Sequence, residues 1–320
     1  MPKQMRKSMT KLPLITLLFS ATLATQAQAM EKLTLVLDWY INPDHAPIMV
    51  AQQTGAFAAE GLEVNIIPPS DPALPPRLVA AKQADLAITY QPQLHFFADQ
   101  GLPLMRVGTL ISSPLNTLMT LDKTVKKPAD LKGKRIGYSV SGIEQATLAT
   151  MLNHDGIKAD QVKLVNVNFQ LTSALMTGQV DAVIGGYRNI EALEMKLQSK
   201  NPIVFNVEDY GVPAYDELII VANRDEAHSE KIKKFLRALK KGNAQLQAHP
   251  EESWQAFARA HAELNTPLNH QAWRATLPLF AADPAKLERA RYQAYDQFLF
   301  DNRLIKSLTP VERYAIGSDK

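Results

Sequence analysis

Short apolar segments alternate with amphipathic segments along most of this chain, and polar residues stand at the junctions. The segment 33–37 predicts a strand, and 45–54 predicts a helix that ends at Gly55, a residue favoured just after helices. This alternation indicates an α/β fold in which largely parallel sheets are covered by helices on both faces. It predicts further strands at 63–67, 85–89, 104–110, 135–139, 162–167 and 181–185, and further helices at 73–84, 144–154, 171–177 and 189–199.

The strand pattern stops near Asp225, and the rest of the chain predicts helices with breaks near Pro250, Pro267 and Pro284. Two strand–helix sets followed by a helical tail predict two α/β lobes. We expect the chain to cross between the lobes near residues 119–123 and 221–224. Residues 30–120 and 224–320 would then form the first lobe, and residues 121–223 the second.

The first 29 residues have the three parts of a secretory signal peptide. A basic start precedes a short apolar run at 12–23, and small residues at 27–29 suit a signal peptidase. The alternative is a membrane anchor, but a spanning helix needs about 20 apolar residues and this run is shorter. We therefore predict export to the periplasm. The basic residues of the segment are Lys3, Arg6, Lys7 and Lys11.

The charge of the exported chain differs from that of the whole sequence. The signal holds four of the 35 Lys and Arg residues and none of the 32 acidic residues, so the mature chain has 31 basic against 32 acidic side chains. A chain so near neutrality has no general attraction to nucleic acid or to anionic membranes. We expect neither as a partner.

Several kinds of chemistry are absent from the sequence. The chain has no cysteine, which excludes thiol catalysis and a lipoprotein anchor. His45 and His95 lack the spacing of a zinc site, so we expect no metal site. The phosphate-binding glycine motifs and the G-x-S-x-G motif of serine hydrolases are also missing. We therefore expect no cofactor and no catalytic residue.

Polar and aromatic residues follow five of the predicted strands. Ligands of open α/β sheets bind outside the carboxyl ends of strands, and an aromatic face with a few polar groups suits a planar heterocycle. Structural interpretations also exist: Trp39 can be a core aromatic, Tyr90 can cover a sheet edge, and Glu191 can be a helix-start carboxylate favoured by the helix dipole. The clusters are Asp38-Trp39-Tyr40, Tyr90-Gln91, residues 113–116, residues 139–144, and Gly186-Tyr187-Arg188 with Glu191.

Several motifs are similar to those of one known family. The opening segment 37–45 is LDWYINPDH and residues 113–116 are SPLN, and both are fairly specific. Less specific pieces are ADLAI at 84–88, LKGKRIGY at 131–138 and GQVDA at 178–182. Over about residues 33–225 the chain resembles the NMT1/THI5-like family. That family includes pyrimidine-binding receptors of thiamine salvage and yeast-type pyrimidine synthases.

The resemblance implies a type II periplasmic-binding-protein fold, with two Rossmann-like lobes that close on a ligand about a hinge and a helical C-terminal tail. It implies that the ligand is formylaminopyrimidine or hydroxymethylpyrimidine. Trp39 would stack on the ring, Tyr90 and Tyr187 would complete an aromatic cage, and Glu191 would accept hydrogen bonds from the amino edge. The polar substituent of the ligand would contact Asn116 and three residues of the turn at 141–144, namely Ser141, Gly142 and Glu144.

The synthase branch of the family carries residues that this chain lacks. The resemblance places Thr89 and Gln93 where the synthases have a lysine for pyridoxal phosphate and a reacting histidine, and residues 212–217 where they have a cysteine-rich stretch. Their phosphate-holding glycine loop corresponds to 139–144, where Glu144 at a helix start would repel a phosphate. We therefore expect a binding protein, and we interpret His45 as structural.

The sequence thus predicts a monomeric periplasmic solute-binding protein that delivers a thiamine-related pyrimidine to an ABC-transporter permease at the inner membrane. One alternative is a receptor of the same fold for a sulfonate, riboflavin or another heterocycle, with Arg188 available to an anion. The other alternative is a pyrimidine synthase, which the missing lysine and cysteines oppose.

Overall fold

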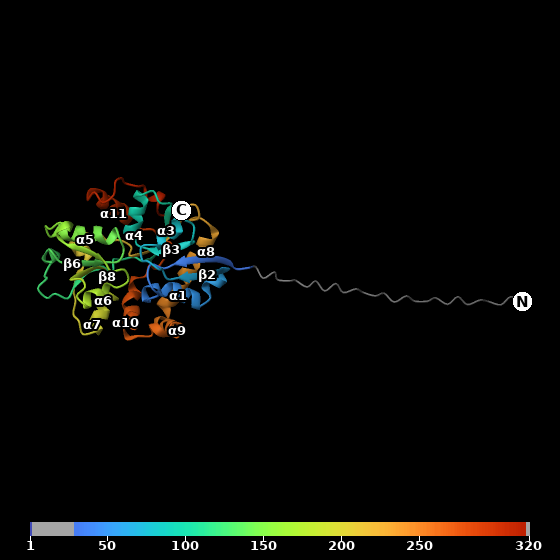
Figure 1. The fold of residues 1–320 in the computed structure, drawn as a ribbon. Coiled ribbons are helices and arrows are strands. Elements are labelled where there is room, and N and C mark those ends of the chain that lie inside the picture. Colours follow the sequence, from blue (N-terminus) through green and yellow to red (C-terminus); the bar gives the residue numbers. More distant parts are fainter. Residues whose placement is uncertain (2–28, 318–320) are drawn as a thin grey trace.

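The computed structural model describes residues 29–317 together with Met1. The predicted signal peptide, residues 1–29, therefore lies almost wholly outside the described residues. Within the described part of the chain, no helix is long and apolar enough to cross a membrane. Figure 1 shows the fold coloured along the sequence.

The first of two five-stranded sheets, sheet A, contains one reversed strand. It consists, in spatial order, of β2 (Leu62–Ile67), β1 (Glu31–Val36), β3 (Leu86–Thr89), β10 (Leu218–Asn223) and β4 (Leu104–Ile111). β1 pairs in parallel with β2 and β3, whereas β10 pairs antiparallel with β3 and β4. All six residues of β10, LIIVAN, are buried, as expected for a central strand covered on both faces.

The second sheet, sheet B, repeats this arrangement with its own reversed strand. It consists, in spatial order, of β7 (Lys163–Asn166), β6 (Arg135–Tyr138), β8 (Ala182–Tyr187), β5 (Asn116–Thr120) and β9 (Ile203–Asn206). β6 pairs in parallel with β7 and β8, and β5 pairs antiparallel with β8 and β9. In Figure 1, β6 and β8 lie to the left and β2 and β3 to the right.

The chain crosses between the two sheets earlier than the sequence analysis placed the crossings. Residues 116–120 already belong to sheet B, and residues 218–223 have already returned to sheet A. The crossings therefore lie in residues 112–115 and 207–217 rather than near 119–123 and 221–224. Both reversed strands pair with strands distant in sequence, and a local apolar pattern carries no sign of which sheet such a strand joins.

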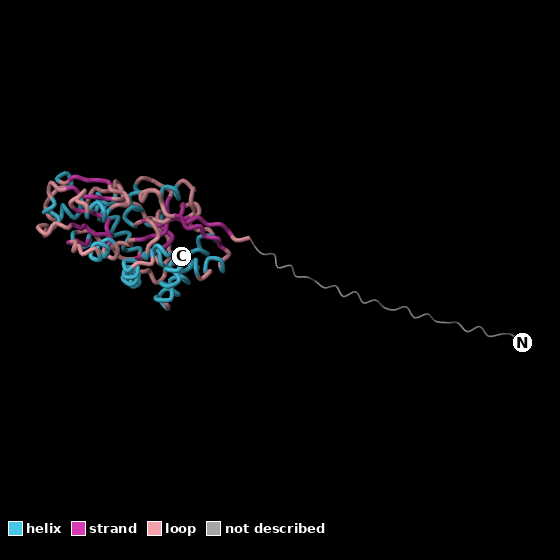
Figure 2. Tube along the Cα trace, turned by 60° about the horizontal axis from the view of Figure 1, so that its bottom comes forward, coloured by secondary structure: helices cyan, strands magenta, loops and turns pink. Residues whose placement is uncertain are grey.

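Helices cover both faces of the sheets (Figures 1 and 2). Pro250 and Pro267 each stand at the first residue of a tail helix, where their missing N–H leaves no hydrogen bond unmade, so the breaks expected there are confirmed. The helices are α1 (Ala46–Gln53), α2 (Ala56–Ala59), α3 (Pro75–Ala80), α4 (Gln91–Asp99), α5 (Ile143–His154), α6 (Leu171–Met176), α7 (Glu191–Leu197), α8 (Glu230–Ala248), α9 (Pro250–Ala260), α10 (Pro267–Thr276) and α11 (Arg289–Asp301).

The last helix, α11, packs against the cores of both sheets. Tyr292 lies in the hydrophobic cluster that contains Val36 and Ile219 of sheet A. Tyr295 and Leu299, one and two turns further along, lie in the cluster under sheet B. Tyr292 also donates a hydrogen bond of 3.0 Å to Asp216 in the second crossing segment. The helical tail therefore ties the two sheets together at the crossings.

The contact between α1 and α8 contains no room for an added methyl group. A Cβ on Gly242 of α8 would lie 2.6 Å from both the Ala51 Cβ and the Pro47 carbonyl oxygen of α1. Glycine to alanine in a helix interior normally gains about 1 kcal/mol, but overpacking a tight contact costs about 1–3 kcal/mol.

We predict that Gly242→Ala lowers the free energy of unfolding by about 1–2 kcal/mol, because the steric cost exceeds the helix-propensity gain. Urea denaturation of the purified protein measures this change. The exposed change Ala244→Ser on the same helix is the control and should stay within about 0.5 kcal/mol of the unmodified protein. Equal or greater stability of Gly242→Ala would show that α1 and α8 do not pack this closely.

Candidate ligand-binding cavity

A cavity of about 470 Å³ lies where strand ends of the two sheets meet. It is lined by residues that follow β1 and β3 of sheet A and by residues at the end of β8 of sheet B. The reversed strands contribute from their amino ends: Ile219 of β10 pairs with Thr89, and Asn116 of β5 pairs with Tyr187. A reversed strand begins where its neighbours end, so Asn116 and Glu217 reach the same edge. This is the expected ligand edge of open α/β sheets.

Six of the eight residues chosen from the sequence line this cavity. They are Trp39, Tyr90, Asn116, Glu144, Tyr187 and Glu191. Ser141 and Gly142 do not line it, and both are exposed. Gly142 is the residue just before α5, and the first helical turn carries Ile143 and Glu144 inward instead. The expected contact of Ser141 and Gly142 with a ligand substituent therefore has no support in this arrangement, because neither residue lines the cavity.

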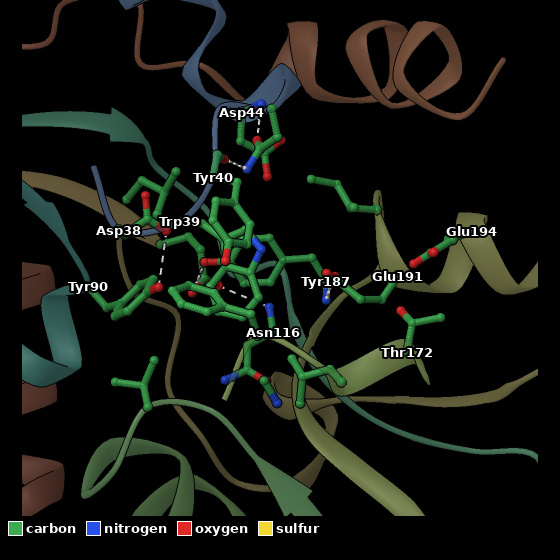
Figure 3. A pocket seen from close by; sticks show the side chains of 18 of the residues that line it. Asp38, Trp39, Tyr40, Asp44, Tyr90, Asn116, Thr172, Tyr187, Glu191 and Glu194 are labelled. Carbon is green, nitrogen blue, oxygen red and sulfur yellow. Dashed lines mark hydrogen bonds between the residues drawn. The ribbon is translucent and has the colours of Figure 1, made fainter. Parts of the chain in front are cut away.

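Aromatic rings from both sheets meet at the cavity. Trp39 and Tyr40 follow β1 of sheet A, and Phe169 follows β7 of sheet B. The ring centroids of Trp39 and Phe169 lie 4.6 Å apart in an edge-to-face arrangement, and those of Tyr40 and Phe169 are also 4.6 Å apart. Figure 3 shows Trp39 and Tyr40 at the centre of the view. Sequence reasoning missed Phe169, although it directly follows a predicted strand at 162–167.

A buried hydrogen-bond chain holds Tyr90 and the loop after β1. The Tyr90 hydroxyl donates to Asp38 Oδ2 at 3.0 Å, and His45 Nε2 lies 2.9 Å from Asp38 Oδ1. The Asn42 N–H donates to His45 Nδ1 at 3.3 Å, so Nε2 carries the ring proton and donates to Asp38. His45 is fully buried and does not line the cavity, which supports the structural interpretation of this histidine.

Glu217 joins the crossing segments through one carboxyl group. Its Oε2 accepts from the backbone N–H groups of Leu115 and Asn116 and from the Tyr215 hydroxyl, the last two at 3.0 and 3.1 Å. Its Oε1 accepts from the Tyr187 hydroxyl at 3.2 Å. Sequence reasoning did not select Glu217. The available signal was an acidic residue directly before the apolar run 218–222.

Glu144 is held against β8 by a glycine. Its Oε2 accepts from the Ser139 N–H at 2.6 Å. Gly185 of β8 has φ of +97°, and a Cβ there would overlap the Glu144 carboxyl group. The Gly185 N–H donates to Asn116 Oδ1 at 3.0 Å. Gly185 thus supplies both the backbone conformation and the space that this cavity wall requires.

Comparison with known proteins assigns the chain to a family. The model of a family described as "NMT1/THI5 like" matches residues 42–253. The chain belongs to the NMT1/THI5-like family. A protein of Haemophilus influenzae whose name refers to thiamine biosynthesis is 52% identical, over 90% of this chain and 92% of that protein. The formylaminopyrimidine-binding protein of Halalkalibacterium halodurans is 36% identical, over 80% of this chain and 79% of that protein.

Solved structures confirm the expected fold of this family member. The alkanesulfonate-binding protein of Xanthomonas axonopodis pv. citri matches with a TM-score of 0.71 over 90% of this chain and 98% of that chain. At 16% identity the match concerns the fold alone. The two mixed five-stranded sheets are thus those of a type II periplasmic binding protein, as the resemblance implied.

The cavity of this family member is lined by six carboxyl groups: Asp38, Asp44, Glu144, Glu191, Glu194 and Glu217. Among the described residues, no Lys, Arg or His side chain lines it. Burial raises the pKa of Glu144 to about 8, those of Glu191 and Glu217 to about 7, and that of Asp44 to about 6. Within the described part of the chain, no three His, Cys, Asp or Glu side chains are grouped to hold a metal ion.

The raised pKa of Glu144 makes stability depend on pH with a definite sign. The unfolded chain loses this proton near pH 4.5, whereas the folded protein keeps it to about pH 8. The free energy of unfolding therefore falls as pH rises through this window. We predict that Glu144→Gln, which cannot ionise, flattens the fall between pH 5 and pH 8 and is more stable at pH 8, by on the order of 3 kcal/mol.

Urea denaturation at pH 5, 6, 7 and 8 measures this dependence on the protein without ligand. The matched control is Glu63→Gln, a change at an exposed glutamate of β2 far from the cavity, and its pH dependence should equal that of the unmodified protein. A Glu144→Gln curve parallel to both would mean that Glu144 is not the desolvated group described.

Proposed function

We propose that this protein is the periplasmic solute-binding component of an ABC importer and that it binds formylaminopyrimidine or hydroxymethylpyrimidine in the cavity. The observation that carries the proposal is the pairing of an aromatic wall with carboxyl groups and with no cationic side chain among the described lining residues. A 4-aminopyrimidine has a flat ring and an amino edge rich in donors, so it matches both parts.

Glu191 is the proposed partner of the amino edge. It is the first residue of α7, and its Oε2 accepts from the Tyr187 N–H at 2.7 Å. With a pKa near 7, its carboxyl group exists in both protonation states near neutral pH. The carboxylate accepts from the exocyclic amine, and the carboxylic acid in addition donates to the neighbouring ring nitrogen. Trp39 stacks on the ring in this proposal, with Tyr90 and Tyr187 beside it.

In this proposal the two lobes close on the ligand, and the positions of these groups support it. Trp39 and Tyr90 follow strands of sheet A, whereas Tyr187 and Glu191 belong to or follow β8 of sheet B. A ligand between them contacts both halves and stabilises the closed state by its differential affinity for that state. The remaining parts of the proposal are export by residues 1–29, a monomeric state, and delivery to a permease at the inner membrane.

The structure disfavours a sulfonate as ligand. Arg188, the residue available to an anion in the sequence, donates two hydrogen bonds to Glu208 at 2.7 and 2.8 Å and does not line the cavity. An anion in the cavity would face six carboxyl groups with no cation among the described lining residues.

A synthase is the second alternative, because family members named as pyrimidine phosphate synthases also match the chain. At the positions that the resemblance assigns to their lysine and histidine, Thr89 donates a hydrogen bond to Gln93 at 2.5 Å. Both side chains are buried, and neither lines the cavity. His45, already paired with Asp38, does not line it either. These contacts support a binding protein.

We predict that residues 30–320 bind formylaminopyrimidine or hydroxymethylpyrimidine and that Trp39→Ala and Glu191→Ala each weaken binding about 10- to 100-fold, the loss expected for a stacked ring or a hydrogen bond to a carboxylate. Isothermal titration calorimetry measures both. Glu63→Ala, at an exposed site on β2, is the matched carboxylate control and should leave affinity unchanged. Thiamine, riboflavin and taurine complete the panel, and binding of one of these with no binding of either pyrimidine would refute the proposal.

A further inference from the structure

Asn189 stands between two proposed ligand-binding residues, yet its own side chain does not line the cavity. Tyr187 and Glu191 on either side of it do line it. Asn189 is 5% exposed, so its amide group needs hydrogen-bond partners inside the protein. Neither the sequence motifs nor the proposed function uses this residue.

The amide group of Asn189 binds two residues that are distant in the sequence. Its Nδ2 donates to Asp44 Oδ1 at 2.7 Å and to Thr276 Oγ1 at 2.8 Å. An amide nitrogen carries two hydrogens, so both bonds form at once. Thr276 Oγ1 also lies 2.8 Å from Asp44 Oδ1, and both residues are almost fully buried. These three side chains, the Asn189 cluster, therefore form a polar contact that is shielded from water.

The Asn189 cluster connects the two halves of the molecule away from the crossing segments. Asn189 lies between β8 and α7, and Met195 of α7 packs in a hydrophobic cluster of sheet B. Asp44 follows β1, and Thr276 ends α10, whose Trp273 packs in the hydrophobic cluster of sheet A. Figure 1 shows α7 and α10 side by side. Because no member of the cluster belongs to a crossing segment, a hinge motion at the crossings separates its members.

Two buried oxygens of the Asn189 cluster have no donor. Asp44 Oδ2 and Asn189 Oδ1 are each without a hydrogen-bond partner among the described residues. Burial without a partner is destabilising for each oxygen, and separation of the lobes returns both oxygens to water. This cost offsets part of what the hydrogen bonds of the cluster contribute. Such a contact suits a state that forms and breaks better than it suits permanent burial.

We propose that Asn189 is a positioning residue that holds the two lobes together over an occupied cavity, through its hydrogen bonds to Asp44 and Thr276, and thereby slows release of the ligand. This inference rests on the proposed function, which places the ligand between Trp39 of one lobe and Glu191 of the other. Asn189 lies two residues before Glu191. Its bond to Asp44, five residues after Trp39, therefore sets how closely the two lobes hold the ring.

Loss of the Asn189 amide should act on ligand release rather than on ligand capture. We expect Asn189→Ala to raise the dissociation rate of the tighter-binding pyrimidine about 10-fold, because the closed state loses hydrogen bonds that the open state does not make. The association rate should change by no more than about 3-fold, since the ligand enters the open state. Stopped-flow tryptophan fluorescence at pH 7.5 gives both rates. Asn153→Ala, at an exposed asparagine of α5, is the matched control and should leave both rates unchanged.

Thr276 allows the hydroxyl group alone to be tested. Thr276→Val removes the hydroxyl with little change of shape, whereas Thr276→Ser keeps it. We expect the valine variant to release the ligand about 5-fold faster and the serine variant to stay within about 2-fold of the unmodified protein. A merely structural role predicts instead that the valine variant has a lower free energy of unfolding and unchanged rates.

Either of two outcomes overturns the inference while the proposed function stands. The first is a folded Asn189→Ala protein that releases the ligand at the unmodified rate. The second is a Thr276→Val protein whose dissociation rate equals that of Thr276→Ser, a comparison that decides the matter even if Asn189→Ala does not fold. If neither pyrimidine binds the unmodified protein at millimolar concentration, the proposed function itself fails, and this inference fails with it.

Discussion

Six carboxyl groups line one cavity of this protein, and the need to give their buried oxygens donors explains much of the surrounding structure. A carboxylate removed from water is strongly destabilising unless hydrogen bonds replace its hydration. Glu217 receives two backbone N–H groups and two tyrosine hydroxyls. Asp38 receives His45 and Tyr90. Glu144 receives the Ser139 N–H and occupies the space that Gly185 leaves free.

These hydrogen bonds also connect the two sheets to each other. Glu217 stands at the start of β10 in sheet A, yet its donors include the first residues of the segment entering β5 of sheet B. Asp44 of the β1 side accepts from Asn189 of the β8 side. The acidic groups that line the cavity therefore also connect the two sheets.

The sequence predicted the parts of this site that depend on local patterns. The parallel strands and their carboxyl ends follow from apolar runs and turn residues, and this placed Trp39, Tyr90, Tyr187 and Glu191 correctly at the cavity. Glu217 was missed because its position depends on how distant strands pair, whereas Phe169 follows a predicted strand and was simply not selected. Ser141 and Gly142 were misplaced because the direction of a side chain at a helix start depends on the exact residue at which α5 begins.

The two segments in which the chain crosses between the sheets also show what local sequence patterns cannot predict. The sequence analysis predicted no strand at 116–120 or 218–223, whereas both segments are buried strands that are reversed relative to their neighbours. Reversal brings Asn116 and Glu217 to the ligand edge, which a local pattern does not encode. The tail carries a similar non-local relation, since α11 packs on both sheets through Tyr292 and Tyr295.

A crystal structure of the protein with formylaminopyrimidine bound is the most direct test of the central claim, that this cavity is an acceptor-rich site for an aminopyrimidine. We expect the ring stacked on Trp39 and its amino group within hydrogen-bond distance of Glu191. A ligand bound outside the cavity, or with its amino edge turned away from every one of the six carboxyl groups, would contradict the account.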